Sequence, residues 1–464
     1  MSIINNMPNK SGSDINGLIE DYYVYAGQTI NAGDFVNFVN GVASQATETS
    51  SSVQLSGSYD GYKISAVVLD ENRVFIAHSY GSSYSLYAMV VTISGTTITK
   101  GTDTALNTNG YNGYYVSATC LQNGSVLVLH SKTSSGSLNG IVCTIDGTTI
   151  AKGTDQELTT KSNSSVAMST EVLENGDVFL AHCYNNSNYL YGVIIKVSGT
   201  SITYGTETSI NGNSSSGLTI SISLLNNNKI FVAHSYNSTY YYLYGIIITI
   251  NGTTITKGTD TQLSTNSYTG QKISIQTLEN GNVFIAHSYS DTLWLYGIVC
   301  TINDTTIIKG TDTCLDSSAK NDAIADVKSV LYKGKVFIPH GAVSSNSQSL
   351  YGVFCTINGT TITAGSDIAL NSSAKTGTVI SPLLLFNDTI FIAHSYGGSY
   401  YLYAQIFGID EVNNVPTNNV PIPVYEQQIT LATQPPFNGI AKTDGVGGTA
   451  IAHKDIISIY VPNI

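Results

Sequence analysis

The segment Val74–Tyr80 (VFIAHSY) recurs seven times in this chain of 464 residues. Every copy contains a histidine, and the histidines follow one another at a nearly constant interval. They are His78, His130, His182, His234, His287, His340 and His394. A fixed period of about 50 residues indicates stacked or radially arranged copies of one structural unit. The repeat therefore constrains the fold more strongly than any other feature of the sequence.

The fourth copy shows what one unit contains. Its sequence predicts strands at Leu218–Leu225, Lys229–Tyr236, Tyr242–Ile250 and Thr253–Leu263, joined by Asn- and Gly-containing turns typical of hairpins. The second strand is apolar on both faces, as expected of a sheet packed between two neighbours. Seven such units predict an all-β protein with a seven-bladed β-propeller of four-stranded antiparallel blades.

The ends of the repeat array predict how the ring closes. The seventh copy lacks the fourth strand after Asp410. Ahead of the first copy, VQLSGSYDGYKIS (Val53–Ser65) is similar to TQLSTNSYTGQKIS (Thr261–Ser274), which includes part of a fourth strand. We therefore expect an N-terminal strand to complete the last blade, so that no blade edge is left unpaired.

The flanking sequences differ in composition from the repeats. Short alternating apolar segments near both ends predict short strands separated by Gly-containing turns. Six of the nine prolines lie beyond residue 415, which predicts a stiff linker. The expected organisation is a flexible tail at 1–19, short strands at 20–46, the propeller at 47–410, the linker at 411–425 and short strands at 426–464.

Composition argues against several classes of partner. Only 11% of the residues are charged, the net charge is −12, and lysines and arginines form no cluster, so we expect no nucleic-acid binding. No stretch approaches the ~20 apolar residues that span a bilayer, so we expect no membrane insertion. The N-terminal MSIINNMPNKSGSD lacks the apolar core of a secretory signal.

The cysteines are expected to be free thiols. Cys143, Cys300 and Cys355 occupy equivalent positions in different repeats, which are too far apart for disulfide bonds.

The two flanking segments carry a resemblance to a known group of proteins. YAGQTINAGDFVNFVNG (Tyr25–Gly41) and NGIAKTDGVGGTAIAHKDIISIYVP (Asn438–Pro462) together resemble a small β module of structural proteins in tailed bacteriophages and prophages. The FIAHSY and LYG repeats are also similar to arrays in clostridial-type prophage proteins. In the phage pattern the two halves lie close in sequence, whereas here the whole repeat array separates them. The resemblance thus implies that residues 20–46 and 426–464 are the two halves of one small β-barrel or sandwich module, into which the propeller is inserted.

The resemblance implies a non-enzymatic structural protein in the virion, as capsid decoration or as a tail or fibre component. The terminal module would attach it, in several copies, to other virion proteins. The propeller would project outward and contact a host-surface glycan. A free glycan-binding lectin is the alternative function, and a propeller glycosidase is a third hypothesis.

Aromatic residues near the repeated histidines are the candidate ligand-binding residues. Flat aromatic faces beside Ser, Asn and Thr donors suit sugar rings, which present apolar C–H faces and hydroxyl edges. The alternative for the tyrosines of the Leu-Tyr-Gly motif is packing within the blade. The predicted glycan-binding residues are Tyr80, Tyr184, Tyr236, Tyr289, Trp294 and Tyr396.

The repeated histidines and acids are interpreted as structural. Metal binding needs three or four ligands within a few ångströms of one another, and equivalent positions on different blades are too widely spaced for this. We therefore expect histidines satisfied by backbone groups, no metal site and no cofactor. The acids of the Gly-Thr-Asp motif are expected to be turn or solubility residues, and no catalytic motif predicts an enzyme. These acids are Asp103, Asp155, Glu207, Asp260, Asp312 and Asp367.

Overall fold

In a computed structural model, the chain divides into two compact units: residues 50–407, and residues 1–49 with 408–464. The structure describes strands in both terminal segments and most of residues 48–409. The expected tail (apart from Leu18 and Ile19) and the expected linker lie outside the described residues. Gaps within 48–409 fall at 58–59, 81–82, 109–112, 114, 133–136, 160–164, 185–188, 212–215, 237–240, 265–271, 290–293, 317–322, 333, 344–347, 372–375, 387–388 and 397–399.

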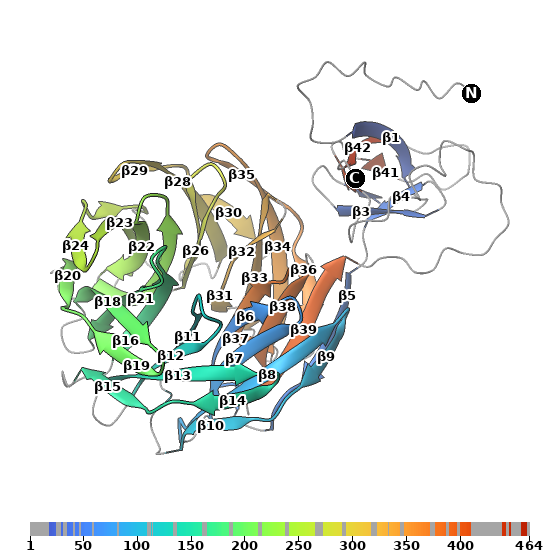
Figure 1. Cartoon of the computed structure of the whole chain (residues 1–464). Helices are drawn as coiled ribbons and strands as arrows, with labels where there is room; N and C mark the ends of the chain where they lie inside the picture. The colour runs from blue at the N-terminus through green and yellow to red at the C-terminus, as the bar shows by residue number, and fades with distance from the viewer. Residues whose placement is uncertain are drawn as a thin grey trace. The chain divides into compact units, whose positions relative to one another are not determined.

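The larger unit is a ring of seven antiparallel sheets, which confirms the predicted seven-bladed propeller (Figure 1). The described residues form strands and turns without a helix. Accordingly, none of them belongs to a helix long and apolar enough to cross a membrane.

The innermost strand of each blade contacts the innermost strands of its neighbours. Hydroxyl groups link several of these strands: Ser223 Oγ lies 2.7 Å from Thr277 Oγ1, and Ser274 Oγ lies 2.8 Å from Ser329 Oγ. Short polar side chains therefore let seven strands converge on one axis. The inner strands are β6 (Lys63–Asp70), β11 (Val116–Cys120), β16 (Ser165–Val172), β21 (Ser216–Leu225), β26 (Ile273–Thr277), β31 (Ala323–Val327) with β32 (Val330–Tyr332), and β37 (Thr376–Leu384).

The second and third strands of each blade supply the apolar core. A fully buried phenylalanine recurs on the second strand, as in Phe75 and Phe179. The second strands are β7 (Arg73–Ser79), β12 (Val126–Ser131), β17 (Val178–Tyr184), β22 (Lys229–Tyr236), β27 (Val283–Tyr289), β33 (Lys335–Val343) and β38 (Ile390–Tyr396). The third strands are β8 (Leu86–Ser94), β13 (Leu138–Asp146), β18 (Leu190–Ser198), β23 (Tyr242–Asn251), β28 (Trp294–Asn303), β34 (Gln348–Asn358) and β39 (Tyr401–Ile409).

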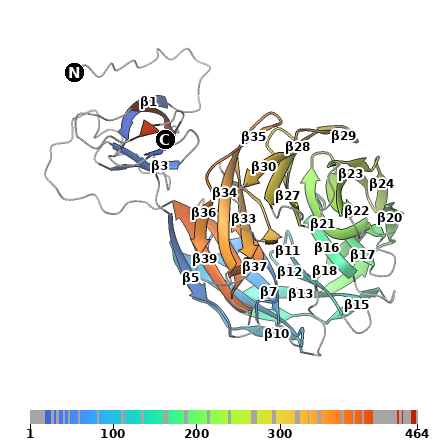
Figure 2. The ribbon, with the colours of Figure 1, turned by 180° about the vertical axis from the view of Figure 1, so that it is seen from behind.

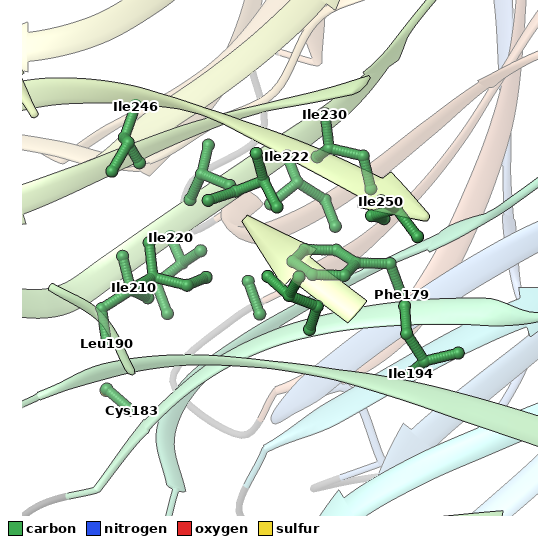
Figure 3. Close-up of a cluster of buried hydrophobic side chains, with 14 of the residues drawn as sticks. Phe179, Cys183, Leu190, Ile194, Ile210, Ile220, Ile222, Ile230, Ile246 and Ile250 are labelled. Carbon is green, nitrogen blue, oxygen red and sulfur yellow. The ribbon is translucent and has the colours of Figure 1, made fainter. Parts of the chain in front are cut away.

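Adjacent blades pack face to face through these residues. Figure 3 shows Phe179 and Ile194 of the third blade against Ile222, Ile230 and Ile250 of the fourth. Burying a side chain of this size contributes roughly 1.5–3 kcal/mol. The apolar character of both sheet faces is therefore a consequence of packing each blade between two others.

The outer strand differs from the sequence-based expectation of one continuous strand. It is broken in two by the Gly-Thr-Asp motif, and both pieces pair with the third strand. At the break, the Gly101 amide donates to the Val90 carbonyl at 3.0 Å, and a Cβ at Gly101 would lie only 2.5 Å from that oxygen. The pieces are β9 (Thr97–Lys100) and β10 (Thr104–Asn107), β14 (Thr149–Lys152) and β15 (Gln156–Thr159), β19 (Ser201–Tyr204) and β20 (Thr208–Asn211), β24 (Thr254–Lys257) and β25 (Thr261–Gln262), β29 (Thr306–Lys309) and β30 (Thr313–Asp316), and β35 (Thr361–Ala364) and β36 (Ile368–Asn371).

The seventh blade takes its outer strand from the other end of the propeller sequence. β5 (Glu48–Gln54) pairs with β39, and the two lie side by side in both views (Figures 1 and 2). The Leu55 amide continues the pairing with a 2.8 Å bond to the Leu402 carbonyl. The predicted ring closure is confirmed.

The second unit is a closed barrel made from both ends of the chain, which confirms the predicted terminal module. Its strands follow the order β1-β4-β3-β40-β42, and β2 pairs separately with β41. The strands are β1 (Leu18–Val24), β2 (Thr29–Ile30), β3 (Phe35–Val39), β4 (Val42–Gln45), β40 (Gly439–Ala441), β41 (Gly445–Val446) and β42 (Ile456–Val461).

Candidate functional site

A buried histidine and an acid of the same blade meet in six of the seven sheets. The histidine comes from the second strand, and the acid lies at the break in the outer strand. The shortest distances between histidine Nε2 and a carboxylate oxygen are 3.0 Å for His78–Asp103, 3.1 Å for His130–Asp155, 3.5 Å for His182–Glu207, 3.0 Å for His234–Asp260, 2.9 Å for His287–Asp312 and 3.6 Å for His340–Asp367.

A donor from the preceding blade completes several of these pairs. The side-chain amide of Asn107 donates to Asp155, that of Asn211 donates to Asp260, and the Ser264 hydroxyl donates to Asp312 at 3.2 Å. Burial alone would raise the pKa of Asp155. Hydrogen bonds and charge from His130, with bonds from Asn139 and Asn107, instead lower it to about 2. Each network therefore fastens one blade to the next.

These networks correct two sequence-based interpretations. The Gly-Thr-Asp acids were expected to be turn or solubility residues, but they are hydrogen-bonded partners of buried histidines. The histidines were expected to find only backbone partners. His78 does bond the Asp60 carbonyl through Nδ1, at 2.7 Å, but its Nε2 faces Asp103. In these six blades the acid lies at the break in the outer strand, beside the histidine.

The seventh blade lacks the acid. Aligned through the shared Gln-Leu-Ser sequence, Ser52 of the closing strand stands where Asp260 stands in the fourth blade, and Ser52 is exposed. Within the described part of the chain, Nε2 of His394 has no hydrogen-bond partner. Burial lowers the pKa of His394 to about 4, against a weak opposing effect of the Ser395 carbonyl.

Restoring this acid with Ser52→Asp is expected to increase stability in acid. With its folded-state pKa depressed, His394 contributes a loss of stability as pH falls from about 6.5 to about 4, because only the unfolded chain takes up the proton there. A carboxylate beside Nε2 raises the pKa of His394 and reduces that loss. Urea denaturation at pH 7 and pH 4.5 checks this, with Ser52→Asn as the uncharged control. An equal loss of stability in all three proteins contradicts it.

The predicted aromatic residues lie at the ends of the second and third strands, where the second-to-third loops emerge. Tyr80, Tyr236, Trp294 and Tyr396 are partly exposed, whereas the side chains of Tyr184 and Tyr289 lie outside the described residues. The loop tyrosines contact those of Leu-Tyr-Gly: ring centroids lie 5.3 Å apart for Tyr236–Tyr244 and 5.0 Å for Tyr396–Tyr403. Trp294 stacks 6.4 Å from Tyr296.

The Leu-Tyr-Gly tyrosines also have a packing role. Each described one stacks on the histidine opposite it in the sheet, with centroids 5.9 to 6.1 Å apart. In the second blade, Asn139 takes the tyrosine position and bonds Asp155 at 3.0 Å instead. The two roles considered from the sequence, blade packing and an exposed aromatic face, therefore coexist in one residue.

A second aromatic cluster lies at the same end of the blades, where the seventh blade meets the first. The ring of Tyr62 contacts those of Tyr84 and Tyr400 edge-on, with centroids 5.1 and 5.2 Å away. The Lys63 amine lies over Tyr62 and Tyr115, 5.3 and 5.1 Å from their centroids. We call these five residues the seam cluster.

The backbone of the seam cluster is strained and closely packed. Tyr84 and Tyr400 have φ values of 51° and 49°, a region that bulky residues rarely adopt. The Gly61 amide donates to the Tyr400 carbonyl at 2.6 Å, and a Cβ at Gly61 would lie 2.9 Å from that oxygen. Strain of this kind is concentrated at binding and catalytic sites.

Lys63 begins β6, Lys272 lies just before β26 and Lys328 lies between β31 and β32. Lys272 and Lys328 both interact electrostatically with Lys63, and the Lys328 amine pairs with Asp326 at 4.0 Å. Burial first, and then the charges of Lys272 and Lys328, lower the pKa of Lys63, while Asp326 opposes this. Two main-chain amides already bond Asp326, those of Val327 and Ile380. The chain is acidic overall, yet positive charge is gathered at this point.

Sequence reasoning missed the seam cluster and these lysines. It followed the loops after the repeated histidines, whereas Tyr62 precedes the inner strand β6 and Lys63 begins it. The signal was present in Gly61-Tyr62-Lys63 and in Gly270-Gln271-Lys272, which occupy the same place in two repeats. Their convergence depends on the curvature of the ring.

The sequence matches no known protein family and shows no significant similarity to a curated protein. Among solved structures, an ulvan lyase of a polysaccharide lyase family, bound to -[GlcA(1-4)Rha3S]-, has a TM-score of 0.54 at 8% identity, covering 76% of this chain and 95% of its own. The NanB sialidase of Streptococcus pneumoniae has a TM-score of 0.44 at 12% identity (76% and 70% coverage). The SapL1 lectin, in complex with alpha methyl fucoside, has a TM-score of 0.40 at 9% identity, covering 67% of this chain and 98% of its own.

The similarity to the ulvan lyase extends over most of both chains and shows a shared propeller fold. It also corrects the sequence-based exclusion of an enzyme, since this architecture carries catalysis in a polysaccharide lyase. The exclusion relied on missing short motifs. In a propeller, reactive groups come from loops of different blades, so a local motif is not required.

Proposed function

We propose that this protein binds an anionic carbohydrate at the end of the propeller that carries the seam cluster. The observation that carries the proposal is the position of the Lys63 amine over Tyr62 and Tyr115, with Tyr62 flanked by Tyr84 and Tyr400. Aromatic rings suit the C–H faces of sugars, and an adjacent ammonium group suits a carboxylate or sulfate substituent.

The axial lysines favour an anionic sugar over a neutral one. Burial lowers the pKa of Lys63, and repulsion by Lys272 and Lys328 lowers it further, while Asp326 raises it. A bound carboxylate or sulfate would offset this repulsion, which a neutral sugar cannot do. Binding is therefore expected to weaken as pH rises through the lowered pKa of Lys63.

An array of immobilised neutral, uronate-bearing and sulfated glycans tests the proposal. Binding is expected on anionic glycans only, and Lys63→Met should weaken it at least about ten-fold, since a charged hydrogen bond is worth roughly 1.5–3 kcal/mol. Lys229→Met is the matched control, because Lys229 begins β22 at the opposite end of its blade. Binding to no glycan, or equal binding by both variants, would refute the proposal.

We further propose display on a phage particle, with attachment through the terminal barrel to other virion proteins. The support is the resemblance of the end segments to phage modules, together with the closed barrel that these ends form. Deleting residues 421–464 removes β40, β41 and β42 and should prevent co-purification with particles while leaving glycan binding intact. Unchanged incorporation of the truncated protein would contradict attachment through the barrel, and absence of the full-length protein from purified particles would favour the alternative, a free lectin.

A further inference from the structure

The junction between the fifth and sixth blades departs from the hydrogen-bond pattern of the other junctions. At three other junctions, a neutral donor at the end of one outer strand bonds the acid of the next blade: Asn107 to Asp155, Asn211 to Asp260 and Ser264 to Asp312. The equivalent residue of the fifth blade is Asp316, which faces Asp367 of the sixth. An ionised carboxylate accepts hydrogen bonds and donates none. Two acceptors therefore occupy the place of a donor and an acceptor.

A second substitution removes positive charge from the same junction. In the second blade, the Lys152 amine bonds the carbonyl of Leu106, next to the junction residue Asn107. The first, second, fourth and fifth blades all have lysine at this position, whereas the sixth blade has Ala364. The junction with two carboxylates thus also lacks the lysine that would lie beside them.

His340 adds a third electron-pair donor to these carboxylates. The side chain is buried, with 1% of its surface exposed. Its Nδ1 lies 3.3 Å from the Ile338 carbonyl, which only an N–H can satisfy, so a neutral ring leaves a lone pair on Nε2. Among the residues that the structure describes, that Nε2 has no hydrogen-bond partner, and it lies 3.6 Å from Asp367 Oδ1. In the other blades that pair a histidine with aspartate, this distance is 2.9 to 3.1 Å.

In the third blade, a tyrosine hydroxyl bridges a histidine and an acid that are also more than 3.1 Å apart. His182 and Glu207 are 3.5 Å apart, and the Tyr204 hydroxyl bridges them at 3.2 and 2.7 Å. The residue equivalent to Tyr204 in the sixth blade is Ala364, which has no hydroxyl group. The wider spacing of His340 and Asp367 is therefore not explained by a bridging side chain at that position.

We propose that Asp316, His340 and Asp367 bind a divalent transition-metal ion, with Zn²⁺ as the representative ion. One ligand atom from each residue lies within 4.8 Å of the other two. Ligands on a tetrahedral Zn²⁺ at 2.0–2.2 Å are separated by roughly 3.4 Å, so a modest contraction completes the site. One imidazole nitrogen and two carboxylates favour Zn²⁺ or Mn²⁺ over Ca²⁺, which prefers six to eight oxygens. The ion would join two blades, and a water molecule would supply the fourth ligand.

This site corresponds to one of the repeated histidine positions, at which the sequence predicted no metal. Within one blade the sequence offers only a histidine and an acid, which are too few ligands. The third ligand comes from the neighbouring blade, where aspartate replaces the asparagine of other junctions. The site is separate from the seam cluster, so its failure and that of the proposed glycan binding are distinguishable.

Calorimetric titration of the full-length, EDTA-treated protein with Zn²⁺ tests the proposal. One site per chain is expected, with an increase in the thermal midpoint on adding Zn²⁺. Asp316→Asn restores the residue found at other junctions and should fold normally yet bind Zn²⁺ at least 100-fold more weakly, as should His340→Gln. Asp304→Asn removes the same charge from an exposed position and should leave affinity unchanged.

Two outcomes would overturn the proposal. In the first, the wild-type protein binds neither Zn²⁺ nor Mn²⁺, and the midpoint of its thermal unfolding does not change when either ion is added. If Asp316→Asn is then more stable than the wild type at neutral pH, the substitution acts by removing charge repulsion and no metal is bound there. In the second, Asp316→Asn binds Zn²⁺ as tightly as the wild type, which places the ion elsewhere. Removing the terminal barrel should not affect Zn²⁺ binding, because all three ligands belong to the propeller.

Discussion

Replacing Asp260 with alanine is expected to lower the free energy of unfolding by about 2–3 kcal/mol, because it removes hydrogen bonds to a charged group. Asp260 lies 3.0 Å from Nε2 of the fully buried His234 and also accepts a bond from Asn211 of the preceding blade. The substitution leaves the buried imidazole facing no acceptor and removes a link between two blades. Equilibrium denaturation in urea measures the change.

The matched control for this prediction is Asp304→Ala. Asp304 pairs with Lys229, but 76% of its side chain is exposed, so water screens the interaction and little change in the denaturation midpoint is expected. Equal effects of the two substitutions would show that the histidine–acid networks do not contribute to the stability of the ring.

Replacing Glu171 with glutamine is expected to stabilise the protein by about 2 kcal/mol at pH 8 and not at pH 4. Burial raises the pKa of Glu171 to about 7, against a bond from the Leu224 main-chain amide. Each pKa unit corresponds to about 1.4 kcal/mol, and the partial exposure of the side chain reduces the full value. Glutamine keeps the shape of the side chain without the charge.

The direction of this pH dependence follows from proton binding. Between pH 4.5 and about 7, the folded chain holds the Glu171 proton that the unfolded chain has lost, so stability falls as pH rises through this window. Above pH 7, the full destabilisation is present in the wild type and absent from Glu171→Gln. Denaturation midpoints at pH 4, 6 and 8 measure this, and a constant difference between the two proteins would contradict it.

The propeller could be predicted from the sequence because its determinants are local and repeated. The period of the histidines defined the units, the Asn-Gly turns defined the hairpins, and the similarity of Val53–Ser65 to an outer-strand segment predicted the ring closure. Both ends of the chain could likewise be assigned to one barrel from the pairing of their motifs. Each of these signals lies within a few residues or recurs many times.

The candidate sites were harder to predict because they combine residues from different blades. In the sequence, Asp103 follows His78 and Asp155 follows His130 at the same interval of 25 residues. That each acid contacts its histidine depends on the break in the outer strand, which the sequence alone did not show. Asp316 acquires its role only by facing Asp367 across a blade junction. Lys63 of the first blade and Lys272 of the fifth interact electrostatically only because the blades are arranged in a ring.

Hydrogen exchange measured by mass spectrometry, with and without an anionic oligosaccharide selected from the array, would locate the carbohydrate on the propeller. We expect slower exchange in peptides that cover Gly61–Lys63, Tyr84 and Tyr400, and no change at Asn123-Gly124 and Asp146-Gly147 in the turns of the opposite end. Slower exchange at those turns, with Gly61–Lys63 unaffected, would contradict the assignment of carbohydrate binding to the seam cluster.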